Sequence, residues 1–328
     1  MISTTTTTRR FEKNSSVEWL KKGLVVLVLL HSIRTMAQDP ELFLPGQVST
    51  IFKERDMTIS KDGNHLLFSM HDYKDGVRMI VEMKRTSGKW SSPKVVSFSG
   101  VYKDLEPMFD PSQDRLFFAS DRPLEKGDES GDFNIWYVPK DNSGWGRPVP
   151  MNSTINGPGD EYYPSISNNG NLYFTATRSD SKGKEDIYMS RWQDGKYQKS
   201  LSLDSAINSS TYEFNAFIDP AEQYLLFSSY GRTDGFGGGD LYLSLKGKDG
   251  LWQPAIHLSQ GINSSQLDYC PFVSADGRTM YFTSNRYRSE AIQSVESLIS
   301  QMENFQNGFD NIYSIPMSEI KEMSVFEK

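Results

Sequence analysis

EYYPSISNNGNLYFTATR, residues Glu161–Arg178, and DYCPFVSADGRTMYFTSNR, residues Asp268–Arg286, are two copies of one pattern. Each copy begins with an acidic residue, passes through a proline and a polar turn, and ends with an alternating apolar run and an arginine. Alternating apolar residues bounded by Asn-Gly or Asp-Gly are typical of two strands joined by a hairpin. Because the pattern returns within one chain, it predicts a repeat fold.

Three further copies bring the number of repeats to five. They cover residues 106–122, 213–232 and, in a degenerate form, 55–72. Successive copies lie 50 to 57 residues apart, and a second strand signature such as Asp186-Ile187-Tyr188 follows most of them. Units of this length with four short strands indicate a β-propeller, because a lone four-stranded sheet cannot bury both of its faces. We therefore predict an all-β chain, a single β-propeller of five four-stranded blades, with six blades as the alternative.

The two ends of the repeat region predict how the ring closes. Residues 38–54 resemble the fourth strand that the fifth repeat lacks, so this N-terminal strand is expected to complete the last blade. The propeller repeats then occupy residues 55–316, and residues 317–328 form a C-terminal tail.

An insertion at residues 289–306 interrupts the fifth repeat. Its apolar residues recur at helical spacing and predict an amphipathic helix of about four turns, capped by Ser289 and ended by Asn307-Gly308. The apolar stripe either packs on the propeller itself or docks a partner. The binding candidates on this stripe are Ile292, Val295, Ile299 and Met302, accompanied by Leu298 and Phe305.

The glycine-rich stretch DGFGGGDLYLS, Asp234–Ser244, has two interpretations. A phosphate-binding loop leads from a strand into a helix and carries a Lys-Ser/Thr pair, both of which are missing from this stretch. The sequence instead predicts a hairpin turn in which glycines permit positive φ angles. Phe236 stands in this loop as a further binding candidate.

These repeats, above all SADGRTMYFTSNR and GGGDLYLS, resemble the WD40-like repeats of TolB-type β-propellers and of Bacteroidetes-type cell-envelope propellers. The resemblance covers about residues 40–316. It implies the propeller fold and a scaffold role in the cell envelope. It implies little about activity, because propellers carry many unrelated functions.

The first 37 residues have the features of a signal peptide. Basic residues precede an apolar run at 23–33, and Thr35-Met36-Ala37 offers a cleavage site. We expect an exported protein, periplasmic or secreted, with no transmembrane span after cleavage. Since Cys270 is the only cysteine, neither an internal disulfide nor a lipid anchor is expected. The net charge of −7 disfavours nucleic acid as a partner.

Charged residues recur in register with the repeats. Acidic residues open the inner strand of each unit, at Asp56, Glu106, Glu161, Glu213 and Asp268. Arginines close the second strand in four units, at Arg122, Arg178, Arg232 and Arg286, and His71 takes their place in the first unit. We interpret these groups mainly as structural ion pairs or hydrogen bonds between neighbouring blades. His71 and the four arginines are also candidates for the ligand-binding face.

Together these observations predict a non-catalytic binding or scaffold propeller. It would engage an envelope protein, a peptide or a glycan on the face at the channel mouth. No cofactor is expected, although calcium could be held for structure. The alternative is a five-bladed glycoside hydrolase in which Glu106, Glu161 and Glu213 are the catalytic carboxylates.

Overall fold

The computed structural model describes residues 38–141, 144–287 and 291–323, together with Met1. Ser289, the predicted helix cap, and the predicted signal peptide lie outside these ranges. Residues 39–328 form a compact unit. In the part of the chain that is described, no helix is long and apolar enough to cross a membrane.

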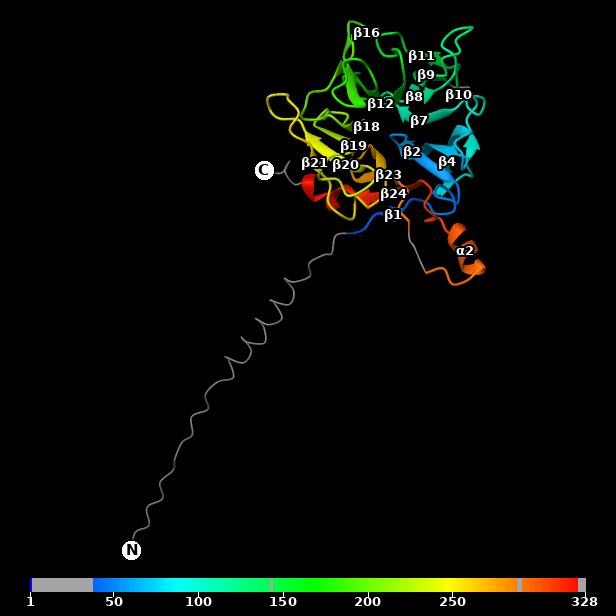
Figure 1. Cartoon of the computed structure of the whole chain (residues 1–328), viewed down its shortest axis with the longest axis vertical. Helices are drawn as coiled ribbons and strands as arrows, with labels where there is room; N and C mark the ends of the chain where they lie inside the picture. Colours follow the sequence, from blue (N-terminus) through cyan, green and yellow to red (C-terminus); the bar gives the residue numbers. More distant parts are fainter. Residues whose placement is uncertain (2–37, 142–143, 288–290, 324–328) are drawn as a thin grey trace. The chain divides into compact units, whose positions relative to one another are not determined.

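Five sheets are arranged around a common axis, which confirms the predicted five-bladed propeller (Figure 1). The innermost strands contact one another in a closed ring, in the order β2, β7, β12, β18, β22 and back to β2. The strands of the blades follow in chain order. Blade 1 contains β2 (Lys53–Ile59), β3 (His65–His71), β4 (Arg78–Thr86), β5 (Lys89–Trp90) and β6 (Lys94–Val95). Blade 2 contains β7 (Asp104–Phe109), β8 (Arg115–Ser120), β9 (Asn134–Asp141), β10 (Gly144–Trp145) and β11 (Val149–Pro150).

The other three blades follow the same plan. Blade 3 contains β12 (Glu161–Ile166), β13 (Leu172–Ala176), β14 (Asp186–Ser190), the hairpin β15 (Trp192–Gln193) and β16 (Lys196–Tyr197), and β17 (Leu201–Ser202). Blade 4 contains β18 (Tyr212–Ile218), β19 (Tyr224–Tyr230), β20 (Asp240–Leu245) and β21 (Ile256–His257). Blade 5 contains β22 (Asp268–Val273), β23 (Thr279–Ser284), β24 (Asn311–Pro316) and β1 (Glu41–Leu42).

Strand β1 closes the ring as predicted, because it pairs antiparallel with β24 and supplies the fourth strand of blade 5. The segment after β24 also packs on the propeller. It begins with the short helix η1 (Met317–Glu319), and Met317 and Ile320 are buried.

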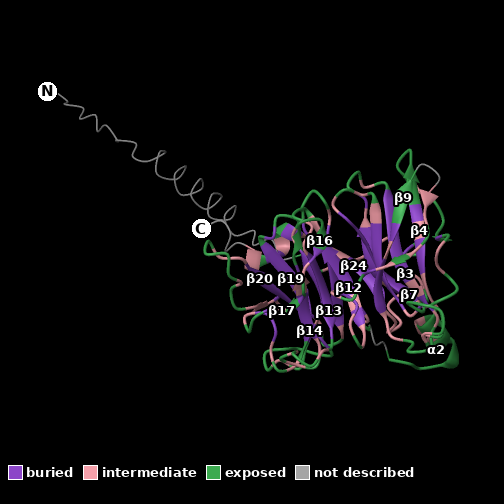
Figure 2. Ribbon diagram, turned by 90° about the horizontal axis from the view of Figure 1, so that it is seen from above, coloured by how far each residue is buried: buried purple, intermediate pink, exposed green. Residues whose placement is uncertain are grey.

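The core lies between neighbouring sheets, where the strands are buried and the exposed residues gather in the loops (Figure 2). One phenylalanine recurs at the same place in the second strand of every blade, and all five side chains are at most 1% exposed: Phe68, Phe118, Phe174, Phe227 and Phe282. This recurring buried phenylalanine thus contributes to the packed core of every blade.

Backbone hydrogen bonds also join one blade to the next. The first residue of an inner strand donates its N–H to the carbonyl that precedes the third strand of the previous blade. Examples are Glu161 to Phe133 at 2.7 Å, Glu213 to Glu185 at 2.9 Å and Asp268 to Gly239 at 2.9 Å. The bond from Glu54 to Asp310, at 2.9 Å, closes the ring between blades 5 and 1.

The glycine-rich loop is a turn between β19 and β20, but its glycines mainly allow a close contact with the next blade. A Cβ on Gly237 would lie 2.4 Å from the backbone carbon of Ser265. The homologous Gly183 approaches the backbone of Thr211 in the same manner. Of the loop glycines, Gly239 alone has a positive φ. The predicted hairpin geometry is therefore a secondary reason for these glycines.

The buried carboxyl group of Glu54 should make the free energy of unfolding depend on pH. Its buried carboxylate accepts hydrogen bonds from Thr50, and burial raises its pKa from 4.5 to about 7. Since the folded state binds this proton more tightly, stability is greatest below pH 4.5 and falls as the pH rises towards 7. We expect Glu54→Gln to match the wild type near pH 4 and to exceed it by up to about 3 kcal/mol above pH 8. Urea unfolding at both pH values measures this; a difference that does not depend on pH would contradict it.

Candidate functional site

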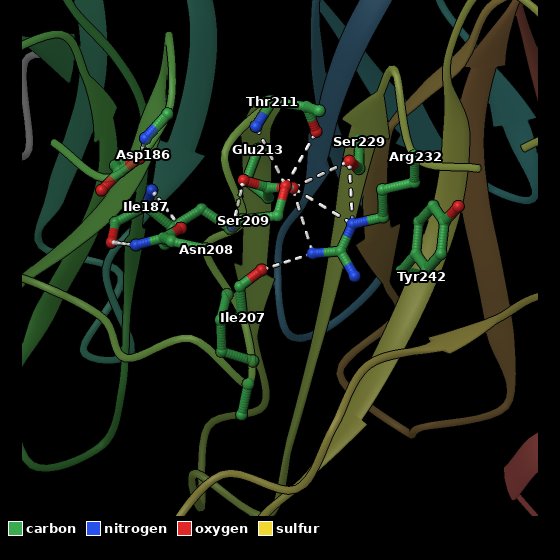
Figure 3. A network of polar contacts seen from close by, with 12 residues as sticks. Asp186, Ile187, Ile207, Asn208, Ser209, Thr211, Glu213, Ser229, Arg232 and Tyr242 are labelled. Atoms are coloured by element: carbon green, nitrogen blue, oxygen red, sulfur yellow. Dashed lines mark hydrogen bonds and ion pairs between the residues drawn. The ribbon is translucent and has the colours of Figure 1, made fainter. Parts of the chain in front are cut away.

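One polar unit is repeated in blades 2 to 5, and Figure 3 shows it in blade 4. The Glu213 carboxylate accepts hydrogen bonds from the Ser209 N–H at 2.7 Å, the Ser229 hydroxyl at 2.9 Å and the Arg232 Nε at 3.1 Å. Arg232 also donates to the carbonyl of Ile207 and lies 4.7 Å over the ring of Tyr242. The equivalent ion pairs are Arg122–Asp104, Arg178–Glu161 and Arg286–Asp268.

Of the two predicted kinds of contact between blades, the hydrogen bond is the one present. The arginine donates to a backbone carbonyl in the linker from the preceding blade, whereas the ion pair lies within one blade. The alignment of acids was wrong in the first two repeats, because the equivalents of Glu161 and Glu213 are Glu54 and Asp104, not Asp56 and Glu106. Asp56 and Glu106 stand two residues further along the strand, so they are exceptions to the repeat.

His71 does not replace the repeat arginine. Its Nδ1 lies 3.2 Å from Asp75, whereas Glu54 is held by Thr50. Burial lowers the pKa of His71 to about 4, and the charge of Arg55 adds to this shift. The imidazole is therefore neutral at ordinary pH.

Asp56 and Glu106 belong to a ring of bulges that surrounds the channel. Each inner strand has one non-glycine residue with φ between 49° and 61° at a break in strand register, and these residues are Asp56, Glu106, Tyr163, Asn215 and Cys270. Such left-handed residues cost free energy and persist where surrounding contacts hold them. Here the backbone N–H groups of Glu106 and Asn215 donate to Ser69 and Thr175 of the preceding blade, at 3.0 and 2.9 Å.

Arg55 neutralises the two exceptional carboxylates. Its guanidinium lies 2.6 Å from Asp56 and 3.0 Å from Glu106, and it stacks 4.8 Å over Tyr269. Cys270 donates to Asp56 at 2.8 Å, and burial raises the pKa of this thiol, which keeps it protonated. The cluster forms a closed polar layer across the channel.

Glu106 is almost saturated with hydrogen bonds. One oxygen accepts from Arg55 and from the Asn215 amide at 3.1 Å, and the other accepts from the Tyr163 N–H at 2.6 Å. Burial, followed by the nearby charge of Asp56, raises the pKa of Glu106 to about 8. In blades 1 and 3 a side-chain hydroxyl accepts the N–H of the bulge residue in the next blade, but Ala119 in blade 2 has no hydroxyl. The Glu106 carboxylate takes the place of that hydroxyl, so its side chain has a structural role.

A cavity of about 280 Å³ opens above this layer. Arg55, Glu106 and Asn215 contribute to its floor, and further lining residues come from four of the blades: Arg78, Leu105, Tyr162, Thr175, Glu185, Phe214, Leu267 and Tyr269. We call this cavity the channel mouth.

Two charged side chains of the channel mouth have no ion-pair partner among the described residues. The Nε of Arg78 is buried without a hydrogen bond, and its guanidinium lies 5.6 Å over the ring of Phe133. Glu185 accepts no side-chain hydrogen bond within the described ranges; burial raises its pKa, and Asp160 adds to the shift. These are the polar groups that a ligand could satisfy.

Arg78 and Glu185 occupy one repeat position at the start of the third strand, where Arg78 is the first residue of β4 and Glu185 directly precedes β14. The other blades carry Phe133, Gly239 and Asp310 there. Sequence reasoning missed both residues. The available signal was a variable position inside an otherwise regular repeat.

A second cavity, of about 390 Å³, lies over blades 1 and 2 and shares Arg78 with the channel mouth. It is lined by loops at 76–78, 100–103 and 121–131. At the other end of the inner strands, a third cavity of about 320 Å³ is lined by apolar residues that include Met108, Phe217 and Phe272. Polar and charged residues such as Lys61 and Asp219 also line this third cavity.

The remaining predicted site residues lie apart from the channel mouth. Phe236 is 47% exposed and packs edge-on against His257, with ring centroids 4.5 Å apart. No group of three or more metal-ligating side chains is found in the described residues, and the structural calcium stays a prediction.

The inserted helix is shorter than predicted and does not pack on the propeller. Helix α2 (Val295–Met302) begins at the cap Ser294 and ends at Glu303, and none of its residues is buried. The apolar side chains that were expected to pack are 44 to 67% exposed: Ile292, Val295, Leu298, Ile299 and Met302. Figure 2 shows the helix in the colour of exposed residues.

Comparisons with known proteins agree on the fold. No protein-family model and no curated protein matches the sequence. Among solved structures, the chain is similar to TolB from Acinetobacter baumannii, with 14% identity, a TM-score of 0.47, and coverage of 81% of this chain and 54% of TolB. A glycoside hydrolase gives 9% identity and a TM-score of 0.54 over 89% of this chain and 94% of that chain. Nidogen in its complex with laminin gives 13% identity and a TM-score of 0.46 over 68% and 71%.

The chain spans about half the length of the TolB structure. At such low identities, similarity above a TM-score of 0.5 shows the fold alone. The repeats and their ring arrangement define a five-bladed β-propeller. The glycoside hydrolase shares this fold, but propellers carry many unrelated functions, so the fold does not assign one to this chain.

Removing the arginine of one repeat unit should destabilise the protein strongly. In Arg232→Met the buried Glu213 loses its counter-ion, and such a loss costs about 3–5 kcal/mol. The double variant Arg232→Met/Glu213→Gln should recover part of this loss, because it leaves no unpaired charge. Chemical unfolding measures both effects; a loss below about 1 kcal/mol in the single variant would contradict the role given to this unit.

Polar substitution on helix α2 should leave stability unchanged. Since Leu298 is 44% exposed, Leu298→Asn should alter the free energy of unfolding by less than about 0.5 kcal/mol. The matched substitution Leu226→Asn, at a fully buried position in β19, should cost more than about 2 kcal/mol. Equal losses in the two variants would mean that the helix packs on the propeller in solution.

Proposed function

We propose that the protein is a non-catalytic binding propeller of the cell envelope that holds a glycan in its channel mouth. The observation that carries this proposal is the pair of partly buried, unpartnered charges, Arg78 and Glu185, which line one concave cavity. Charged groups that are withdrawn from water cost free energy unless a partner compensates them. A bound ligand would supply that partner.

The lining of the channel mouth favours a glycan over a protein surface. A cavity of about 280 Å³ has room for a small ligand group that enters it. A stable protein interface instead buries about 800 Å² on each side. Tyr162 and Phe214 contribute aromatic side chains to the same cavity as Glu185 and Asn215. Sugars combine apolar ring faces with hydroxyls that donate and accept hydrogen bonds, so they match this mixture.

The geometry gives less support to the hydrolase alternative. Glycoside hydrolysis uses two carboxylates that flank the scissile bond, separated by about 5 to 9.5 Å. Glu161 and Glu213 are each held by an arginine in separate blades and do not line the channel mouth. Glu106 does line it, but its oxygens already accept three hydrogen bonds. The three candidates therefore do not form a catalytic pair.

The proposed setting follows from the sequence. A signal peptide at residues 1–37 and the resemblance to envelope propellers support a periplasmic or secreted protein. In that compartment polysaccharides of the cell envelope or of the surroundings are accessible. Nucleic acid is not part of the proposal, since the chain is acidic.

Glycan-array binding with the purified protein tests this function. We expect the wild-type protein to bind a defined set of glycans. Glu185→Gln and Tyr162→Ala should each weaken that binding by about tenfold or more. For Glu185 the reason is that hydrogen bonds to charged groups contribute about 1.5–3 kcal/mol. Glu303→Gln, at an exposed carboxylate that follows helix α2 and lines neither cavity, is the matched control and should bind as the wild type.

Two results would contradict the proposal. Binding to a peptide array but to no glycan would make the channel mouth a peptide site. Release of reducing ends from a bound glycan, abolished by Glu106→Gln, would establish the hydrolase alternative.

A further inference from the structure

We infer that the ligand of the channel mouth carries a carboxylate group, as a uronic-acid sugar does, and that Arg78 binds this group. The inference rests on the proposed glycan-binding function and specifies the class of glycan. It starts from the state of one guanidinium. Arg78 is partly buried, lines the channel mouth, and has no carboxylate partner among the described residues.

The other arginines show how unusual this is. Among the described residues, every arginine that is not exposed has a carboxylate partner within 3.0 Å, except Arg78. The arginines without an ion pair elsewhere in the described ranges are exposed and therefore hydrated: Arg85, Arg147, Arg191 and Arg278. Arg78 is thus the one partly buried arginine in the described ranges whose charge no carboxylate of the protein matches.

The surroundings of Arg78 prepare it for a planar anion. Phe133 stacks on the guanidinium at 5.6 Å, and the Phe133 ring lies 5.1 Å from the ring of Tyr162. Stacking on one face leaves the edge of the guanidinium for hydrogen bonding, and its parallel N–H groups match the two oxygens of a carboxylate. Tyr162 brings an aromatic surface next to that edge, where a sugar ring could lie.

The charge balance of the channel mouth suits a single negative charge. Its other arginine, Arg55, already contacts Asp56 and Glu106. Arg78 is therefore the arginine of the channel mouth whose charge a ligand can match. A carboxylate carries one negative charge, whereas a phosphate monoester carries close to two.

The position of Arg78 suits an oligomeric ligand. It lines both the channel mouth and the cavity of about 390 Å³ over blades 1 and 2. A sugar chain whose uronate sits on Arg78 could place neighbouring units in both cavities. In this arrangement the Glu185 carboxylate accepts hydrogen bonds from sugar hydroxyl groups on the blade 3 side of the channel mouth.

The test compares acidic oligosaccharides with their own carboxyl-reduced forms, which replace only the carboxylate by a hydroxymethyl group. A panel of uronate-containing tetrasaccharides and their reduced counterparts is titrated into wild type, Arg78→Gln, Arg78→Lys and the surface control Arg278→Gln. Wild type and Arg278→Gln should prefer the acidic form by about tenfold or more. Arg78→Gln should bind both forms equally, and Arg78→Lys should keep part of the preference, because an ammonium retains the charge but not the bidentate geometry.

Each outcome decides the inference. If reduced and acidic forms bind wild type equally, or if the preference survives in Arg78→Gln, the inference is wrong while glycan binding stands. If phosphorylated sugars bind more tightly than the acidic panel, the anion is wrongly assigned. If no member of the panel and no glycan on the array binds, both the inference and the proposed function fail.

Discussion

The buried contact between a carboxylate, an arginine and two aromatic rings is the interaction on which the propeller depends. In one step it neutralises the acid at the start of the inner strand, satisfies a carbonyl in the linker from the preceding blade and covers the aromatic residues of the second and third strands. Blades 2 to 5 all contain it. Because the ion pairs are deeply buried, their geometry fixes where each blade begins relative to its neighbour.

Blade 1 lacks this unit, and the exceptional groups of the molecule concentrate around it. Glu54 has no arginine, Asp56 is an added acid in the ring of bulges, and Arg78 stands at the variable position at the start of the third strand. The first blade is also where the ring closes, through β1 and through the hydrogen bond from Glu54 to Asp310. A repeat fold holds itself together with its regular positions, so positions that depart from the repeat are available for recognition.

Much of this fold could be predicted from the sequence, and the reasons are local. Alternating apolar residues, turn residues and the 50 to 57 residue spacing predict the five blades and the closing strand. The residues that line the channel mouth could not be predicted in the same way. Asp56 and Glu106 were aligned with the repeat acids because each strand has two acidic residues two positions apart. The sequence does not show which of the two precedes the bulge. Arg78 and Glu185 were missed because only strand pairing reveals that they share a position. Helical periodicity indicated α2 but could not show that its apolar side remains exposed, which depends on tertiary contacts.

The most direct measurement is hydrogen exchange of the full chain, with and without a glucuronic acid-containing tetrasaccharide. If the channel mouth is the binding site, protection should increase in residues 72–78, 100–106 and 160–163 and around Glu185 and Asn215, which line or flank the two cavities. Helix α2 and the third cavity near Phe217 should not change. Protection confined to either of those regions, or no change in any region, would contradict the central claim that this propeller binds its ligand where the repeat is broken.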